Sequence, residues 1–170
     1  MVTKAETAQV SLPSDREVSV TRAFNAPRAL VYEAYTRPEL VQRWLLGPPG
    51  WSMPVCEMDV REGGRYRWRW RSDEDGKEFG FHGAFLEVDP PSLLRHTESF
   101  DPGDTGENMG DGEALITVRF EERDGVTTVT TLIDFGSKEA RDAAVATGMT
   151  DGMEQSYELL DRLLGEQPPA

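Results

Sequence analysis

Between Trp51 and Phe135 the sequence breaks into short strand-like segments separated by turn signals, and this order restricts the fold more than any other feature. The segments are rich in β-branched and aromatic residues. Asp-Gly and Gly-Gly pairs stand between them, and such pairs are typical of the tight turns that join antiparallel strands. The turn pairs are Gly63-Gly64, Asp75-Gly76 and Asp124-Gly125, with a further turn at Asp89-Pro90-Pro91. The region therefore predicts about six antiparallel strands.

One strand and two short helices are predicted before this region. The strand corresponds to the segment EVSVTRAF. Asn25 is suited to cap a helix that has Pro27 in its first turn. Thr36 and Glu39 then form a capping box, which predicts a second short helix that ends near Trp44.

The C-terminal part of the chain predicts one long helix. Ser137 is a suitable N-cap, and apolar residues recur from there to Leu164 at the spacing of one helix face. These residues are Val145, Met149, Met153, Leu160, Leu163 and Leu164. Strands followed by a segregated helix predict an α+β domain in which the helix lies on one face of the sheet. We expect this single domain to span residues 16–165, with flexible tails at 1–15 and 166–170.

Four glycines inside the predicted elements need an explanation. Gly80 and Gly83 lie within a strand, where glycine permits a bulge or a sharp bend. Gly148 and Gly152 lie one turn apart on the predicted helix, on the face of Met153, and each costs up to ~1 kcal/mol relative to alanine. Two explanations stay open for this second pair: the helix approaches the sheet closely here, or the glycines leave a space empty.

The largest aromatic side chains are concentrated in one part of the chain, because all four tryptophans lie between Trp44 and Trp70. Side chains alternate between the two faces of a strand, so the segment RYRWRWR puts Tyr66, Trp68 and Trp70 on one face and four arginines on the other. Trp44 and Trp51 bracket the proline-rich corner LLGPPG. Such an aromatic face can form a core, the wall of a pocket, or both.

The net charge of the chain argues against polyanionic partners. With 18 basic and 31 acidic residues the formal charge is −13, whereas nucleic acids and anionic membranes are bound by cations. We expect the arginines of residues 65–71 to pair with acidic neighbours such as Glu57 and Asp59, and we expect no nucleic-acid partner and no membrane insertion. The sequence has no run of about 18 apolar residues and no secretion signal, and Cys56 is its single cysteine. We therefore expect a cytoplasmic protein.

Few residues are suited to metal binding or catalysis. A regular hairpin around residues 89–92 would put the two histidines, His82 and His96, on opposite faces of the sheet. The sequence contains no HExxH motif and no cysteine cluster. We therefore expect no metal and no cofactor. Cys56 lies in an apolar strand segment and is expected to be an inert thiol.

Four segments of the chain, taken in order, resemble one protein family. They are VTRAFNAPRALVYEAYTRPELVQRWLLGPPGW, DVREGGRYRW, GAFLEVDPPSLL and KEARDAAVATGMTDGMEQSYELLDRLL. From about Arg16 to Leu164 the chain resembles the SRPBCC (START / Bet v 1-like) superfamily, in particular the branch homologous to the C-terminal domain of the activator of heat-shock-protein-90 ATPase. The resemblance implies a helix-grip fold, in which a curved antiparallel sheet of about seven strands grips the C-terminal helix and leaves a cavity between them. Two departures from the family pattern change the shape of that cavity: Leu45-Leu46, where a second aromatic residue is usual, and Met153, where tryptophan is frequent.

The fold implied by the resemblance predicts that the cavity binds a hydrophobic small molecule, lipid-like or polyaromatic. Two interpretations of His82 stay open: it is a polar anchor in the cavity, because a regular strand puts this residue on the same face as Leu86 and Val88, or it is a structural histidine with satisfied hydrogen bonds. The expected ligand-binding residues are Trp44, Trp51, Tyr66, Trp68, Trp70, His82, Met149, Gly152 and Met153.

Two other functions stay open. The superfamily includes aromatase/cyclase enzymes, for which His82, Tyr66 and Tyr157 are the candidate acid–base groups here. The name of the family also implies a protein-interaction module, so a protein partner is a further alternative. Clustered titratable groups in the cavity would favour catalysis, a cavity without them would favour binding, and an exposed apolar patch would favour the interaction.

Overall fold

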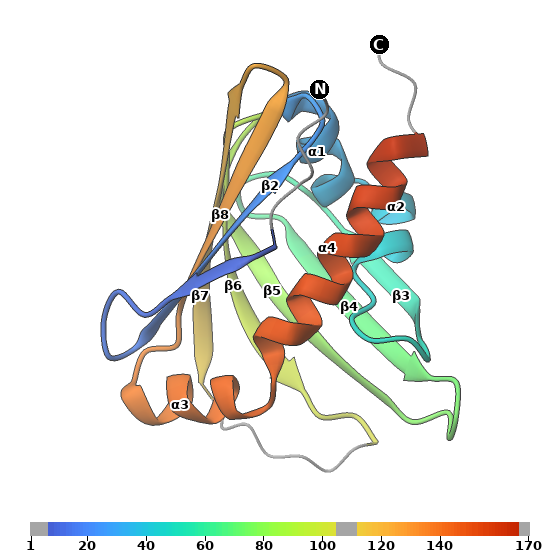
Figure 1. Cartoon of the computed structure of the whole chain (residues 1–170). Coiled ribbons are helices and arrows are strands. Elements are labelled where there is room, and N and C mark those ends of the chain that lie inside the picture. Colours follow the sequence, from blue (N-terminus) through green and yellow to red (C-terminus); the bar gives the residue numbers. More distant parts are fainter. Residues whose placement is uncertain (1–6, 105–111, 167–170) are drawn as a thin grey trace.

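An antiparallel sheet of eight strands bends around a long C-terminal helix in the computed structural model of this protein (Figure 1). The structure describes residues 7–104 and 112–166. The strands lie in the order β1-β2-β8-β7-β6-β5-β4-β3, and all neighbours are antiparallel. Their bounds are Gln9–Ser11 (β1), Glu17–Phe24 (β2), Trp51–Met58 (β3), Arg65–Ser72 (β4), Glu78–Asp89 (β5), Leu93–Asp101 (β6), Glu113–Arg123 (β7) and Val126–Asp134 (β8). The predicted α+β helix-grip architecture is confirmed.

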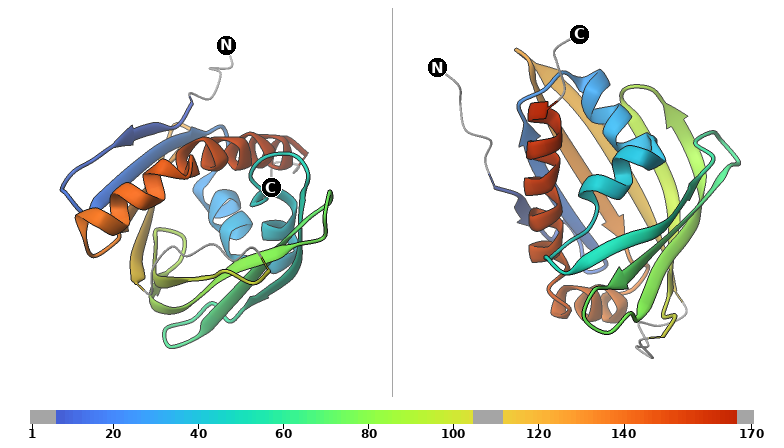
Figure 2. Two further views of the ribbon diagram at one scale, coloured as in Figure 1. Left: turned by 90° about the horizontal axis from the view of Figure 1, so that it is seen from below. Right: turned by 90° about the vertical axis from the view of Figure 1, so that its right-hand side faces the viewer.

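The helices lie before and after the main run of strands. Helices α1 (Arg28–Thr36) and α2 (Pro38–Trp44) connect β2 to β3, and helices α3 (Lys138–Ala146) and α4 (Met149–Glu166) follow β8. Figure 2 shows α4 lying across the open side of the curved sheet, with α1 and α2 near one end of it. Within the described residues, no helix combines the length and the apolar content needed to cross a membrane.

The caps of the two short helices differ from the prediction. Helix α1 has Pro27 as its N-cap rather than Asn25, and α2 has Arg37 as its N-cap, without a side-chain capping bond. Thr36 is the last residue of α1, and its hydroxyl donates to the carbonyl oxygen of Tyr32 at 2.9 Å. A hydroxyl engaged with its own helix is not available to cap the next one, so the predicted capping box does not form.

The predicted C-terminal helix is divided into α3 and α4. Ser137 caps α3 as predicted, by accepting a hydrogen bond from the Ala140 amide at 3.1 Å. Gly148 then has a φ of +80°, a left-handed conformation that ends helices and that glycine adopts without strain. The prediction that Gly148 and Gly152 share one helix face is therefore wrong, because Gly148 lies in the break between the two helices.

A short edge strand lies inside the segment that was predicted to be a flexible tail. Within residues 1–15, Gln9–Ser11 pairs with β2, where Val10 lies opposite Val20. Three residues are too few to show the alternation by which a strand is recognised in a sequence. This strand is what raises the number of strands from about seven to eight.

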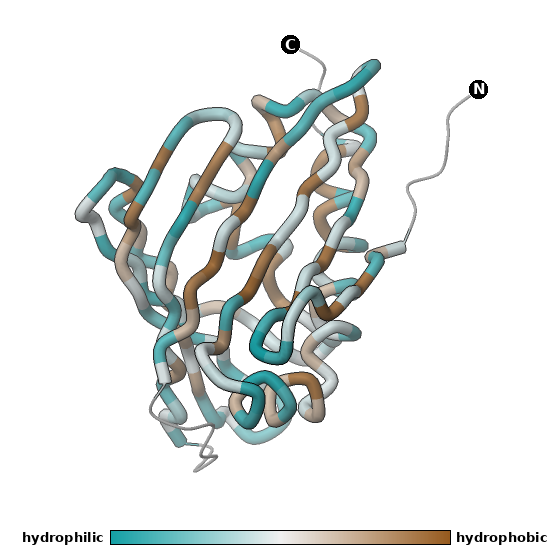
Figure 3. Tube along the Cα trace, turned by 90° about the vertical axis from the view of Figure 1, so that its left-hand side faces the viewer, coloured by the Kyte–Doolittle hydropathy of each residue, from teal (hydrophilic) through white to brown (hydrophobic). Residues whose placement is uncertain are grey.

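The core lies between the concave face of the sheet and the helices. Alternate residues of β2 and β8 are buried, among them Val18, Val20, Val129 and Ile133, and Leu160 of α4 packs into the same cluster. Figure 3 shows apolar and polar residues alternating along the strands. This period of two follows from side chains that point to opposite faces of a sheet.

A buried arginine attaches α4 to the sheet. Arg22, on the inward face of β2, is 3% exposed and forms two parallel hydrogen bonds with Asp161, at 2.9 and 2.8 Å. Its Nε also donates to Glu154 at 3.1 Å. Both carboxylates belong to α4, so one cation on β2 pairs with two anions of the helix and holds the helix in place. The carboxylates raise the pKa of Arg22 against the opposing effect of burial.

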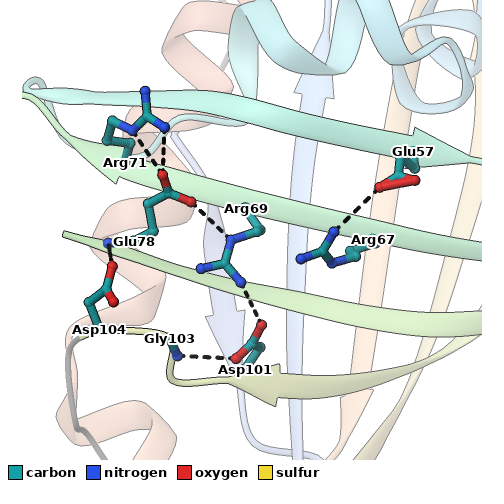
Figure 4. A network of polar contacts seen from close by, with 8 residues as sticks. All are labelled: Glu57, Arg67, Arg69, Arg71, Glu78, Asp101, Gly103 and Asp104. Carbon is teal, nitrogen blue, oxygen red and sulfur yellow. Dashed lines mark hydrogen bonds and ion pairs between the residues drawn. The ribbon is translucent and has the colours of Figure 1, made fainter. Parts of the chain in front are cut away.

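The outer face of β4 carries the predicted arginines, and carboxylates neutralise three of the four (Figure 4). The ion pairs are Arg67–Glu57 at 3.5 Å, Arg69–Glu78 at 3.0 Å, Arg69–Asp101 at 2.9 Å and Arg71–Glu78 at 2.6 Å. Glu57 is one of the predicted partners, whereas the other, Asp59, pairs with Arg61 at 2.8 Å instead. The pairs link β3, β4, β5 and β6 across the convex face.

Candidate ligand-binding site

A cavity of about 360 Å³ lies between the concave face of the sheet and α4. Strands β3 to β8 form its wall together with α1, α2, α4 and the corner that follows α2. The lining residues are Tyr35, Val41, Trp44, Leu45, Leu46, Gly47, Pro48, Trp51, Met58, Tyr66, Trp68, Trp70, Phe79, Phe81, Phe85, Leu94, His96, Glu98, Ile116, Val118, Thr131, Ile133, Met149, Gly152, Met153, Ser156 and Tyr157. Most of these side chains are apolar or aromatic, as is usual for small-molecule sites.

Eight of the nine residues predicted for the site line this one cavity, and His82 is the exception. The eight are Trp44, Trp51, Tyr66, Trp68, Trp70, Met149, Gly152 and Met153. The phenylalanines of β5 also line the cavity but were not predicted, although Phe79, Phe81 and Phe85 alternate in the same way as the aromatic residues of β4. Their period of two could have identified them.

The tryptophans belong to the core and to the cavity wall at the same time. Trp44 is 2% exposed, and its indole donates to the carbonyl oxygen of Ala34 at 2.9 Å. Trp70 donates in the same way to Leu45 at 2.6 Å. These bonds attach the Trp44 ring to α1 and the Trp70 ring to the corner after α2. Two rings of the aromatic wall are therefore held in place by the protein itself.

A bulge in β5 explains why His82 lies outside the cavity. The pairing of β5 with β6 shifts by one residue between Phe85 and Glu87, so the inward positions change from odd to even numbers. Val88 faces inward on one side of this shift, whereas His82, on the other side, is exposed on the outer face. The predicted anchor is therefore in the wrong place. His96, opposite Phe85, is 7% exposed and lines the cavity instead.

The two glycines of β5 do not form this bulge. At Gly83 a Cβ atom would collide with the carbonyl oxygen of Thr97 and lie 2.8 Å from the ring of Tyr66. Glycine is needed at this position because the tyrosine ring and the neighbouring backbone approach it closely. Gly83 thereby gives the Tyr66 side chain room to reach its hydrogen-bond partners.

Tyr66, His96 and Glu98 form a polar cluster in the otherwise apolar wall. The Tyr66 hydroxyl donates to the carbonyl oxygen of Thr97 at 2.6 Å and lies 3.3 Å from Oε1 of Glu98. Nδ1 of His96 lies 3.0 Å from both the Tyr66 hydroxyl and the Thr97 carbonyl oxygen. Because a carbonyl can only accept, Nδ1 carries the proton of the neutral ring, and Nε2 is left as an acceptor.

Burial changes the protonation of this cluster. It lowers the pKa of His96 to about 4, so the imidazole is neutral at pH 7. It raises the pKa of Glu98 to about 7, against a smaller opposing effect of the bond from Tyr66. It also raises the pKa of Tyr66. Glu98 therefore gains and loses its proton near neutral pH.

Glu98 was not among the predicted site residues, although the sequence contains a signal for it. In β6, Leu94, His96, Glu98 and Phe100 lie on one face, and both ends of this series are apolar. Two polar residues on an otherwise apolar face are candidates for a buried site. Carboxylates are usually exposed, and Glu98 therefore did not stand out among the 31 acidic residues.

Gly152 lies where the wall has room to spare. A Cβ atom at this position would meet no atom within 4 Å, and the residue lines the cavity. Of the two explanations considered for this glycine, close contact with the sheet is wrong, and the structure has empty space there.

Groups for other kinds of chemistry are scarce in the described part of the chain. Cys56 is half-buried, lies outside the cavity wall, and has its pKa raised to about 12 by burial, which makes it a poor nucleophile. Among residues 7–104 and 112–166, no three His, Cys, Asp or Glu side chains are grouped so that they could hold a metal ion.

Comparison with known proteins supports the family suggested by the sequence. The chain matches the family model described as Activator of Hsp90 ATPase homolog 1-like protein over residues 25–165. No curated protein matches the sequence. A crystal structure of a protein from Rhodobacter sphaeroides is 30% identical, covers 95% of this chain and 100% of its own, and has a TM-score of 0.86. A crystal structure from Chromobacterium violaceum is 25% identical, covers 91% of this chain and 100% of its own, and has a TM-score of 0.76.

A solution NMR structure of an AHSA1-like protein from Aeromonas hydrophila is similar in fold. It is 19% identical, covers 91% of this chain and 99% of its own, and has a TM-score of 0.70. The region that the family model matches, residues 25–165, includes α1 to α4 and every strand from β3 to β8. This region contains the whole cavity wall. This chain therefore belongs to the Activator of Hsp90 ATPase homolog 1-like family, in agreement with its resemblance to the SRPBCC superfamily.

Proposed function

We propose that this protein binds a hydrophobic small molecule, lipid-like or polyaromatic, in the cavity between the sheet and α4. The observation that carries the proposal is the cavity itself. It has about 360 Å³ of room, within the usual range for small-molecule sites, and its wall is aromatic. Gly152 supports the proposal further, because a helix-destabilising residue faces the space where a ligand would lie.

A neutral aromatic probe such as N-phenyl-1-naphthylamine should bind the native protein and quench its tryptophan emission. The reason is that Trp44, Trp51, Trp68 and Trp70 all line the cavity. Fluorescence titration of the folded protein, repeated at a urea concentration just below unfolding, measures this. Binding that appears only on partial unfolding, or no binding by probes of several shapes, would contradict the proposal.

Gly152→Leu should remove probe binding without loss of stability. The new side chain enters empty space, and the helix gains up to ~1 kcal/mol of propensity. If the site were tightly packed, overpacking would instead cost ~1–3 kcal/mol. Gly165→Leu is the matched control, because it changes a glycine of the same helix that lies outside the cavity wall. Thermal melts and probe titrations of both variants separate the two outcomes.

A second candidate function is acid–base catalysis in the same cavity, which the cluster of Tyr66, His96 and Glu98 favours. A carboxyl group with a pKa of about 7 can both donate and accept a proton at neutral pH. Glu98 then takes the place of His82 as the candidate group. To test this, the molecule that copurifies with Glu98→Gln is isolated, incubated with the wild-type protein and analysed by mass spectrometry. Catalysis predicts that the wild type converts this molecule to a product. Recovery of the molecule unchanged would refute catalysis.

The protein-interaction alternative has less support. The large apolar side chains that are exposed are Val10, Leu12, Leu86 and Val145. They come from β1 and the turn after it, from β5 and from α3, and a few exposed apolar side chains are usual on a protein surface.

A further inference from the structure

The charges of the side chains that line the cavity are not balanced. Glu98 is the one carboxylate in the wall, and among the described residues no lysine or arginine lines the cavity. His96 is neutral and offers an acceptor, and the remaining polar groups are the hydroxyls of tyrosine, serine and threonine and the indole N–H groups of tryptophan, among which that of Trp68 is buried without a partner. As far as the structure describes the wall, the cavity has one anionic group and no cation to balance it.

Arg22, a buried cation next to Tyr157 of the wall, is already paired with carboxylates. Arg22 lies behind Tyr157, with its guanidinium 5.9 Å from the ring centroid, and it is not part of the wall. Glu154 and Asp161 of α4 hold it in ion pairs at 3.1 and 2.8 Å. It has no net charge left with which to bind the acidic head of a ligand.

The surroundings of Glu98 suit a cation. The Tyr66 hydroxyl, from β4 two strands away, lies 3.3 Å from its carboxylate. His96 lies on the same face of its own strand, and Ala114 of β7 is paired opposite it. The ring of Tyr66 lies 4.5 Å from that of Trp68, measured between centroids. The faces of such rings attract cations, and a carboxylate at the edge of an aromatic wall adds an ion pair to this attraction.

We propose that the ligand of this cavity carries a protonated amine, which pairs with Glu98 while the apolar body of the ligand packs against the tryptophan wall. This rests on the proposed binding function and specifies the chemical class of the ligand. A hydrophobic amine satisfies the carboxylate without leaving a charge unpaired. A fatty acid of the same size would place two anions side by side with no cation in reach, which is unfavourable in a buried site.

Binding of the ammonium also moves a proton. Burial raises the pKa of Glu98 to about 7, so the carboxyl is partly protonated in the empty cavity at neutral pH. Pairing with the ammonium favours the ionised carboxylate. The carboxyl therefore releases protons into the buffer when the ligand binds at pH 7, and the ammonium keeps its own.

Isothermal titration calorimetry with 2-naphthylmethylamine, 2-naphthylmethanol and 2-naphthylacetate tests the proposal, because these molecules share one apolar body. At pH 7 the amine should bind at least about tenfold more tightly than the alcohol, and the acid should bind most weakly. Titrations in two buffers of different ionisation enthalpy should show proton release for the amine and none for the alcohol.

Two variants connect the preference to Glu98. Glu98→Gln should bind the alcohol as before and lose both the amine preference and the proton release. Glu113→Gln removes an exposed carboxylate of the adjacent strand and should keep both. If the alcohol binds and the amine binds no better, or if Glu98→Gln keeps the preference, this proposal is overturned while the binding function stands. If none of the three molecules binds, the binding function itself is wrong.

Discussion

Replacing Glu98 by glutamine should raise the free energy of unfolding at pH 8 by about 3–4 kcal/mol and leave it nearly unchanged at pH 4. Burial holds the pKa of Glu98 at about 7, whereas a glutamate in an unfolded chain has a pKa of about 4.3. Between these two values the folded protein keeps a proton that the unfolded chain has released. Stability from this group therefore falls as the pH rises from about 4 to about 7. Glutamine cannot ionise, so the variant avoids the loss.

The pH profile of the wild type alone would not isolate this effect. The pKa of His96 is lowered to about 4, and a histidine that is buried in its neutral form makes stability rise between about pH 4 and 6.5. The two groups have opposite slopes over the same range. The difference between Glu98→Gln and the wild type removes the contribution of His96, since both proteins contain it.

Urea unfolding at pH 4, 6 and 8, followed by tryptophan fluorescence, measures the difference. Glu113→Gln is the control for the net charge of −13, because it removes an exposed carboxylate from the adjacent strand. Its effect should stay within about 0.5 kcal/mol at each pH. A gain from Glu98→Gln that is the same at pH 4 and pH 8 would rule out a buried, protonated carboxyl.

Arg22→Met should lower the free energy of unfolding by about 3 kcal/mol. The substitution keeps most of the apolar stem but leaves Glu154 and Asp161 without their shared cation. Removing one partner of a buried ion pair is more damaging than removing the whole pair, because the remaining charge stays desolvated. The two carboxylates are 19% and 34% exposed, which places the expected loss at the lower end of the range for buried pairs.

Chemical denaturation at pH 7 checks this value. Arg37→Met is the matched control: Arg37 is about half exposed and also contacts two carboxylates, Glu33 and Glu39, but exposed pairs contribute only about 0.2–1 kcal/mol. Similar losses from both variants would show that the Arg22 cluster contributes no more than a surface pair. Hydrogen exchange in α4 should also speed up in Arg22→Met, since the cluster attaches this helix to β2.

Much of the fold was predictable because its signals are local. The Asp-Gly and Gly-Gly pairs mark turns that the structure contains, and the alternation of β4 correctly divides the aromatic residues from the arginines. The resemblance to a known family predicted that the curved sheet packs around the C-terminal helix, and it thereby predicted where the cavity lies. Eight of the nine predicted site residues lie in one wall for this reason.

The errors concern features that depend on neighbouring elements. Thr36 has the right spacing for a capping box, but α1 continues through it and takes its hydroxyl. Gly148 has the right spacing for one helix face, but the chain turns there so that α4 can cross the sheet. Both residues have the spacing that the local pattern requires, but the path of the chain through the fold gives them a different role.

The sequence by itself determined the strands β2 to β8, the C-terminal amphipathic segment and the inward aromatic face, because side-chain alternation and turn preferences are properties of a few consecutive residues. Tertiary structure decided which polar groups enter the cavity. The bulge between Phe85 and Glu87 arises from pairing with β6, and it leaves His82 outside while His96 and Glu98 lie inside. Tertiary structure also decided the pKa of Glu98, since that value depends on how much water the surrounding strands and helices exclude from the carboxyl.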